Sequence, residues 1–225
     1  MKRADDLLLA LQRYSNPSRA GQMEQYMKNR FPFIGVDATE RREALKSFNQ
    51  SNPWHPDMNE LRAFVLSCWE LPWREMHYCG QEELYRHRKH WGATILPLFE
   101  HLITNQSWWD SVDYIASKIL GHHFQKHPGQ IRPAVSKWLK GQNMWLLRCS
   151  LLFQLKHKTQ TDEALLAELV EKLASHHDFF IRKAIGWALR EYGKTNPEFV
   201  LNIVSQLEMS GLSKREATRL LNKYS

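Results

Sequence analysis

Trp108-Trp109-Asp110-Ser111-Val112-Asp113 opens one of five helical segments that recur at a nearly constant spacing along the chain. Aromatic or apolar residues head these segments, at Trp73, Trp109, Trp145, Phe179 and Leu212. The steps between the heads are 36, 36, 34 and 33 residues. A period in this range is typical of helical-repeat proteins, in which each unit buries its apolar face against the next. The sequence therefore predicts an all-α solenoid.

The rest of the chain carries the signals of helices joined by short turns. Helical periodicity is present nearly throughout, and only residues 31–36 offer an apolar run that could be extended. Turn residues at Asn16-Pro17-Ser18, Leu71-Pro72 and His127-Pro128-Gly129 separate segments of ordinary helix length. Because the sequence contains no low-complexity tract and no flexible linker, we predict one continuous domain over residues 1–225.

The balance of charge favours an anionic partner. Lysine and arginine number 31 against 24 aspartates and glutamates, which gives a net charge of +7 and a pI near 9.3. Hydrophobic residues make up 43% of the 225 residues, which is enough to form a sizeable core. A folded protein with this excess of positive charge is suited to bind nucleic acid.

Several other classes are disfavoured. Cys68, Cys79 and Cys149 stand far apart without a Cys-x-x-Cys pair, which predicts reduced and mostly buried thiols. The rings in His122-His123 and in His176-His177 point to different faces of a helix, so we expect surface histidines and no metal or other cofactor. The sequence shows no signal peptide and no run of about 20 apolar residues. The expected location is the cytoplasm, in association with the nucleoid, without a membrane partner.

Capping residues predict where two helices begin. Ser107 is followed three positions later by Asp110, which indicates a cap at Ser107 and an acidic first turn that complements the helix dipole. Ser213-Lys214-Arg215-Glu216 has the form of a capping box, in which the serine accepts from the helix amides and the glutamate reaches back.

The helical phase divides the opening stretch into a buried side and an exposed side. The residues at i, i+4, i+7 spacing form a core stripe, which consists of Trp108, Val112, Ile115, Ala116 and Ile119. Trp109 and Asp113 lie about 100° round from this stripe and one turn apart from each other. We therefore expect Trp109 and Asp113 at the edge of the core or on an exposed groove.

Arg148 is the only charged residue in the apolar segment 144–155. An arginine in such a segment extends to solvent, pairs with a buried acid, or faces an anion. Asp113, one repeat earlier, is the candidate acid.

A basic and aromatic stripe follows in the next segment. Lys183, Trp187 and Arg190 line up at i, i+4 and i+7, which suits a sugar-phosphate backbone, with cations on phosphates and the indole against a sugar or base. The alternative is a tryptophan packed between helices with an arginine stacked on it. Gly186 costs the helix about 1 kcal/mol relative to alanine, which indicates that another group approaches closely at this position.

At the stretch 107–113, together with Arg148 and residues 180–192, the chain closely resembles the AlkD family of DNA glycosylases. The resemblance extends over most of the chain, through further blocks at 26–29, 40–42, 153–156, 194–197 and 212–217. It implies a superhelical solenoid of HEAT-like antiparallel helix pairs with a basic concave face that cradles double-stranded DNA. It also implies excision of positively charged N3- and N7-alkylpurines without a base-flipping pocket, and therefore a role in base excision repair.

Carried over residue by residue, the resemblance places Trp109, Asp113, Arg148 and Trp187 in the catalytic cleft. The DNA-binding residues would be the family tyrosine near the lesion and five basic positions, namely Tyr26, Lys156, Lys183, Arg190, Lys214 and Arg215. An alkylated purine loses its positive charge as it leaves, so the difficult step is stabilising the sugar cation. Asp113 and the two indoles are suited to that step, and Arg148 to holding a phosphate and orienting Asp113.

The leading hypothesis is thus a monofunctional, monomeric glycosylase of the 3-methyladenine and 7-methylguanine type. The alternative is a non-catalytic HEAT-like scaffold that binds DNA or protein, because helical-repeat folds serve many functions. The retention of Asp113 with both tryptophans is the feature that separates the two hypotheses.

Overall fold

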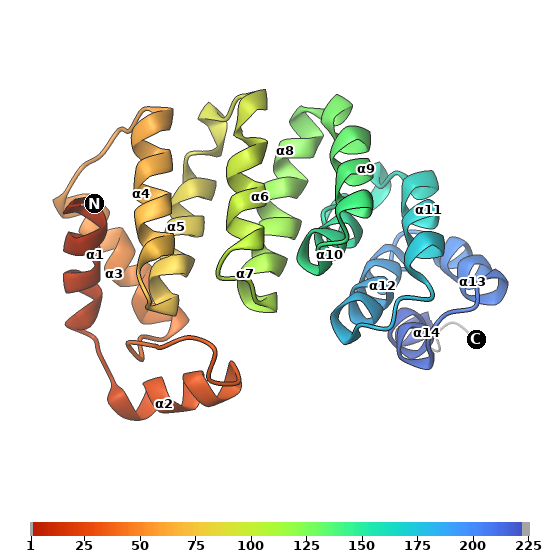
Figure 1. Ribbon diagram of the computed structural model, residues 1–225, viewed down its shortest axis with the longest axis horizontal. Coiled ribbons are helices and arrows are strands. Elements are labelled where there is room, and N and C mark those ends of the chain that lie inside the picture. Colours follow the sequence, from red (N-terminus) through yellow and green to blue (C-terminus); the bar gives the residue numbers. More distant parts are fainter. Residues whose placement is uncertain (1, 222–225) are drawn as a thin grey trace. The chain divides into compact units, whose positions relative to one another are not determined.

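The structure is a computed structural model that describes residues 2–221 (Figure 1). Every regular element among these residues is a helix, and the helices form HEAT-like pairs, so the all-α prediction is confirmed. The chain divides into two compact units, Met1–Leu98 and Phe99–Ser225. The candidate catalytic residues all lie in the second unit.

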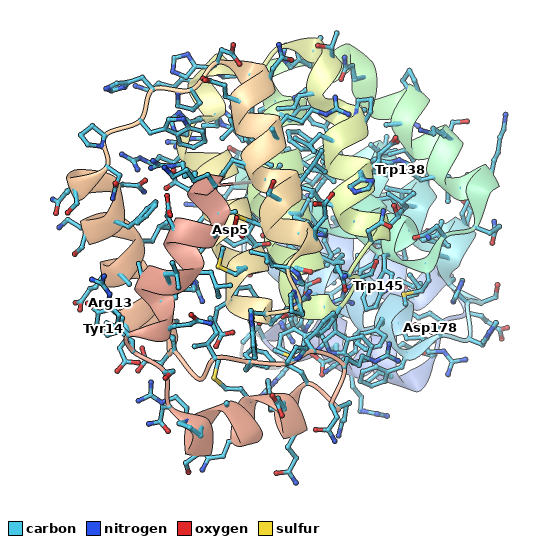
Figure 2. All side chains as sticks on the ribbon, turned by 60° about the vertical axis from the view of Figure 1, so that its left-hand side comes forward. Asp5, Arg13, Tyr14, Trp138, Trp145 and Asp178 are labelled. Atoms are coloured by element: carbon cyan, nitrogen blue, oxygen red, sulfur yellow. The ribbon has the colours of Figure 1, made fainter. Side chains whose placement is uncertain are left out.

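The first unit contains five α-helices and two short 3-10 turns. These elements are α1 (Lys2–Gln12), α2 (Pro17–Tyr26), α3 (Ala38–Ser51), α4 (Met58–Glu70), α5 (Arg74–Arg86), η1 (Arg88–His90) and η2 (Ala93–Ile95). The three-residue link between α4 and α5 makes them an antiparallel pair, and they pack side by side (Figure 1). The side chains of Asp5, Arg13 and Tyr14 mark α1 and the turn after it in Figure 2.

The segment 31–36, the one candidate for extended structure, is irregular and buried. A carboxylate takes the place of a neighbouring strand here. The side chain of Glu75 accepts hydrogen bonds from the amides of Ile34 (3.0 Å), Gly35 (2.9 Å) and Val36 (3.2 Å). Burial raises the pKa of Glu75, while these hydrogen bonds act in the opposite direction. The backbone donors of residues 34–36 are thus satisfied without a sheet.

The second unit follows the same plan, and α6 (Leu96–Thr104) crosses the boundary. Its other elements are α7 (Trp109–Tyr114), η3 (Ile115–Leu120), α8 (Gly121–Lys126), η4 (Pro128–Gln130), α9 (Ile131–Gly141), α10 (Met144–Leu152), η5 (Lys158–Gln160), α11 (Glu163–Leu173), α12 (Phe179–Tyr192), α13 (Pro197–Gln206) and α14 (Gly211–Thr218). The element η3 is π-helical, so residues 109–126 form one continuous helical stretch that widens from Ile115, two residues after Asp113. Such π-helical segments are frequent at functional sites.

The predicted repeat heads all lie at helix starts. Trp73 immediately precedes α5, Trp109 and Phe179 are the first residues of α7 and α12, and Trp145 and Leu212 are the second residues of α10 and α14. In the second unit these helices pack in series, α7 on α10, α10 on α12 and α12 on α14. The repeat period therefore places equivalent positions of successive units next to each other.

Three rings form an aromatic triangle at the starts of these helices. The ring centroids of Trp108 and Trp145 are 5.8 Å apart, and each lies 5.1 Å from the centroid of Phe180. Trp145 in Figure 2 marks the start of α10, and Asp178 caps α12 by accepting from the amides of Phe180 and Ile181. Edge-to-face aromatic pairs contribute about 0.5–1.5 kcal/mol each beyond area burial, so the triangle fixes the starts of α7, α10 and α12 together.

Both predicted caps are wrong. The helix after Ser107 begins one residue later, with Trp108 at the cap position, because the hydroxyl of Ser107 donates to the carbonyl of Ile103 (2.6 Å) and completes the preceding helix. The cap of α14 is Ser210, whose side chain accepts from the amide of Ser213 (3.1 Å). Ser213 and Glu216 lie inside the helix and face α12 instead, because that helix offers them stronger partners.

The predicted core is largely confirmed. The aliphatic members of the stripe in the α7 region are fully buried, whereas Trp108 is only partly buried because it stands before the helix. The three cysteines are buried, as expected. His123 is buried as well, with Nε2 bonded to the side chain of Gln130 (2.9 Å), so its assignment to the surface is wrong.

Candidate active site

The site is built on an ion pair between two successive repeats. The guanidinium of Arg148 in α10 binds the carboxylate of Asp113 in α7 in a bidentate manner, with Nε 2.7 Å from Oδ1 and Nη2 2.8 Å from Oδ2. The side chain of Arg148 is 3% exposed and that of Asp113 is 19% exposed. Of the three alternatives for Arg148, the structure shows pairing with a buried acid.

Two opposing effects act on the pKa of the Asp113 carboxyl. Burial raises the pKa of this carboxyl above the ordinary value, because an ionised group loses hydration. The hydrogen bonds and the charge of Arg148 oppose that effect, and Asp110 adds to it. The carboxylate thus combines limited hydration with one partly exposed edge, a combination that favours a strong electrostatic interaction with a nearby cation.

Arg148 is also held on its other side. Its Nη1 donates to the carbonyl of Phe180, and its Cζ lies 5.6 Å from the ring centroid of Trp187. All three guanidinium nitrogens therefore donate hydrogen bonds to acceptors within the protein. This arrangement fixes the plane of the guanidinium and, through it, the orientation of Asp113.

The two tryptophans of the predicted cleft occupy different positions. Trp187 in α12 lies beside the guanidinium of Arg148, so the structure brings it together with the ion pair. Trp109 begins α7 one turn before Asp113 and is partly buried, as is Trp187. The prediction that Trp109 and Asp113 lie at the edge of the core is confirmed.

The basic stripe of α12 is bound within the protein. Lys183 and Arg190 both form ion pairs with Glu216 of α14, and the Nζ of Lys183 is 2.7 Å from Oε1. The Cζ of Arg190 lies 5.8 Å from the ring centroid of Trp187. The group that approaches Gly186 is also α14, because a Cβ on this glycine would lie 2.4 Å from the Cβ of Glu216. The packed arrangement, which was the alternative for this stripe, is therefore present.

The other predicted DNA contacts differ in their exposure. Tyr26 ends α2 in the first unit and is exposed, as are Lys156 after α10 and Arg215 in α14. Lys214 is partly buried. Within residues 2–221, no three His, Cys, Asp or Glu side chains are grouped so that they could hold a metal ion.

Two contributors to the site are missing from the sequence prediction. The carbonyl of Phe180 is a backbone group, which no side-chain pattern reveals. Glu216 is detectable from the repeat, because it follows Lys183 by 33 residues, close to the 35 that separate Asp113 from Arg148. Asp113 with Arg148, and Lys183 with Glu216, are thus two of the ion pairs that join helices in this unit.

The fold and the site define an all-α protein of HEAT-like helix pairs with a partly exposed carboxylate that is paired to an arginine beside an indole. Residues 7–221 match the family model described as DNA alkylation repair enzyme. The solved structure of a predicted DNA alkylation repair enzyme from Enterococcus faecalis is similar to this chain, with 30% identity and a TM-score of 0.85 over 93% of this chain and 97% of the other. Comparison with curated proteins finds no match. The chain belongs to the DNA alkylation repair enzyme family.

Membership of this family supports an enzymatic role in DNA repair, with DNA as the substrate. Among the described residues, no helix is both long enough and apolar enough to cross a membrane.

Proposed function

We propose that this protein is a monofunctional DNA glycosylase that hydrolyses the N-glycosidic bond of positively charged N3- and N7-alkylpurines in double-stranded DNA. The observation that carries this proposal is the bidentate pair of Asp113 and Arg148, in which the Asp113 side chain stays 19% exposed and the guanidinium of Arg148 lies 5.6 Å from the ring of Trp187. An ion pair that served only the fold would need neither this exposure nor the adjacent indole.

The reaction does not need a strong general acid. The bond between the sugar C1′ and the purine nitrogen breaks with its electron pair moving to the base, which neutralises the positive charge of the alkylated ring. A water oxygen then bonds to C1′ and loses a proton. Asp113 stabilises the cationic sugar through its charge and accepts that proton directly or through solvent.

The remaining residues of the cleft position and shield these groups. The indole faces of Trp109 and Trp187 lie against the cationic sugar, since a π-face attracts positive charge. Arg148 is a positioning residue that orients the carboxylate and keeps it ionised. Because its nitrogens are engaged by protein acceptors, the phosphate contact expected for Arg148 is not part of this proposal.

For DNA binding we propose contacts to the sugar-phosphate backbone from basic side chains and a contact near the lesion from Tyr26. The exposed side chains of Lys156, Arg215 and Tyr26 are accessible for this purpose. A site that contacts the lesion from the backbone side needs no enclosed pocket for the base, so the enzyme acts without extruding the nucleotide. We also propose that it acts as a monomer.

The test is release of free base from duplex DNA that contains 7-methylguanine, compared with spontaneous depurination. We expect release by the wild-type protein and loss of release in Asp113→Asn. Glu168→Gln, which alters an exposed ion pair with Arg132 in the same unit, is the matched control and should retain activity. DNA binding without base release by the wild-type protein would contradict the proposal and support the scaffold hypothesis.

A further inference from the structure

Lys183 and Arg190, the two cations nearest to Trp187 on α12, share one internal carboxylate. Glu216 of α14 places Oε1 2.7 Å from the Nζ of Lys183, and its Oε2 accepts from Nη1 of Arg190. The side chain of Glu216 is 14% exposed. One acid therefore holds two cations that the sequence assigns to DNA phosphates.

The position of Glu216 is fixed by contacts that have no part in the ion pairs. Gly186 leaves the space that the Cβ of Glu216 occupies, because a side chain at position 186 would collide with it. The hydroxyl of Ser213 donates to the carbonyl of Arg182 (3.0 Å) and ties the start of α14 to α12. The packing of α14 on α12 therefore places the carboxylate of Glu216 beside Lys183 and Arg190.

The carboxylate joins the candidate active site through Trp187. The ring of Trp187 has the guanidinium of Arg148 at 5.6 Å and that of Arg190 at 5.8 Å. The first guanidinium is paired with Asp113 and the second with Glu216. Two uncompensated guanidiniums beside this indole would oppose a positive charge developing on the sugar, and each carboxylate reduces that opposition.

We propose that Glu216 is a specificity-determining residue that acts as an internal substitute for a DNA phosphate. It occupies Lys183 and Arg190 in the free protein, so that a DNA backbone must compete with a carboxylate for these cations. The inference rests on the proposed function, since it concerns the DNA interface of the same site. Its consequence is weak binding to undamaged duplex, because a cation that stays paired with Glu216 neutralises no phosphate and so releases no counter-ion from the DNA.

The test measures the affinity of Glu216→Gln for undamaged duplex DNA by fluorescence anisotropy at several salt concentrations. Each cation freed to bind a phosphate steepens the slope of log affinity against log salt by about 0.9. We expect tighter binding by the variant and a slope steeper by about 0.9 to 1.8, so that its advantage over wild type shrinks about 3- to 12-fold between 50 and 200 mM salt. The matched control is Glu171→Gln, which removes an exposed acid of α11 and should leave the slope unchanged.

Two further variants separate competition from a structural role. Glu216→Asp retains the charge and should keep a slope close to wild type. In a Lys183→Gln background, Glu216→Gln has one cation fewer to free, so the slope change should be about half as large. Circular dichroism confirms that each variant is folded.

A Glu216→Gln variant that is folded but binds DNA with the wild-type slope, or more weakly than wild type, would overturn the inference and leave Glu216 as a packing residue. A wild-type protein that binds neither undamaged duplex DNA nor duplex DNA that contains 7-methylguanine would instead contradict the proposed function. The two failures are therefore distinguishable in one experiment.

Discussion

Asp113→Asn should lower the free energy of unfolding, because Arg148 is then left buried without a counter-charge. It should also abolish activity, because the carboxylate that stabilises the sugar cation is missing. Breaking a buried pair by removing one partner costs about 3–5 kcal/mol. Asparagine keeps one oxygen that can accept from Arg148, and the side chain of Asp113 is 19% exposed, so both features reduce the cost. We therefore expect a loss of about 2–4 kcal/mol in the free energy of unfolding.

The assay is urea unfolding followed by circular dichroism at constant pH. With a slope near 2 kcal/mol per molar urea, the expected loss moves the midpoint down by about 1–2 M. Glu168→Gln breaks the exposed pair with Arg132 and should cost less than about 1 kcal/mol. A midpoint for Asp113→Asn equal to that of Glu168→Gln would refute the reasoning that breaking a buried pair lowers the free energy of unfolding more than breaking an exposed one.

A double variant separates the stability effect from catalysis. Asp113→Asn combined with Arg148→Met removes both charges and leaves an apolar side chain in the buried position. Such replacements are often neutral or stabilising, so the double variant should regain about 1.5 kcal/mol or more relative to Asp113→Asn alone. Its release of 7-methylguanine should stay about 10²–10³-fold below wild type, because the electrostatic stabilisation of the sugar is missing. Recovery of activity together with stability would show that Asp113 acts only in the fold.

Three further outcomes are expected. Gly186→Ala should lower the midpoint of urea unfolding, because overpacking against Glu216 costs about 1–3 kcal/mol and exceeds the gain of about 1 kcal/mol in helix propensity; a stabilised variant would show that α14 moves away freely. Glu75→Gln should destabilise the first unit by about 2–4 kcal/mol, since one amide oxygen cannot satisfy the three backbone donors that the carboxylate accepts, and hydrogen exchange at residues 34–36 should rise. Base release should fall on the acid side at a pH above 3.8, the ordinary value for aspartate, because burial raises the pKa of Asp113 and the ionised form is required. An activity profile that is flat down to pH 3.8 would contradict the assignment of Asp113.

The helix starts and the buried stripe are local features, and the sequence predicts them because they depend on spacing within one segment. The heads of the repeats and the burial of Val112 and Ile115 follow from periods of about 35 and 3.6 residues. The single charge in an apolar segment also indicated Asp113, one repeat away, as the candidate acid for Arg148, although two other roles for this arginine stayed open. The caps failed because a serine hydroxyl has several partners in reach. Ser107 and Ser213 found theirs in carbonyls outside the helices assigned to them.

Residue spacing along the chain is enough to predict the class of fold, the repeat that aligns the helices, and the acid that is the candidate partner of Arg148. The groups that surround this pair depend on the packing between repeats. The carbonyl of Phe180 that holds Arg148, and the carboxylate of Glu216 that holds Lys183 and Arg190, come from neighbouring repeats. The physical reason is that a charge in a folded protein pairs with whichever opposite charge or carbonyl the packing brings nearest. Periodicity indicates which helices are neighbours, but the packing of side chains such as Gly186 decides which atoms meet.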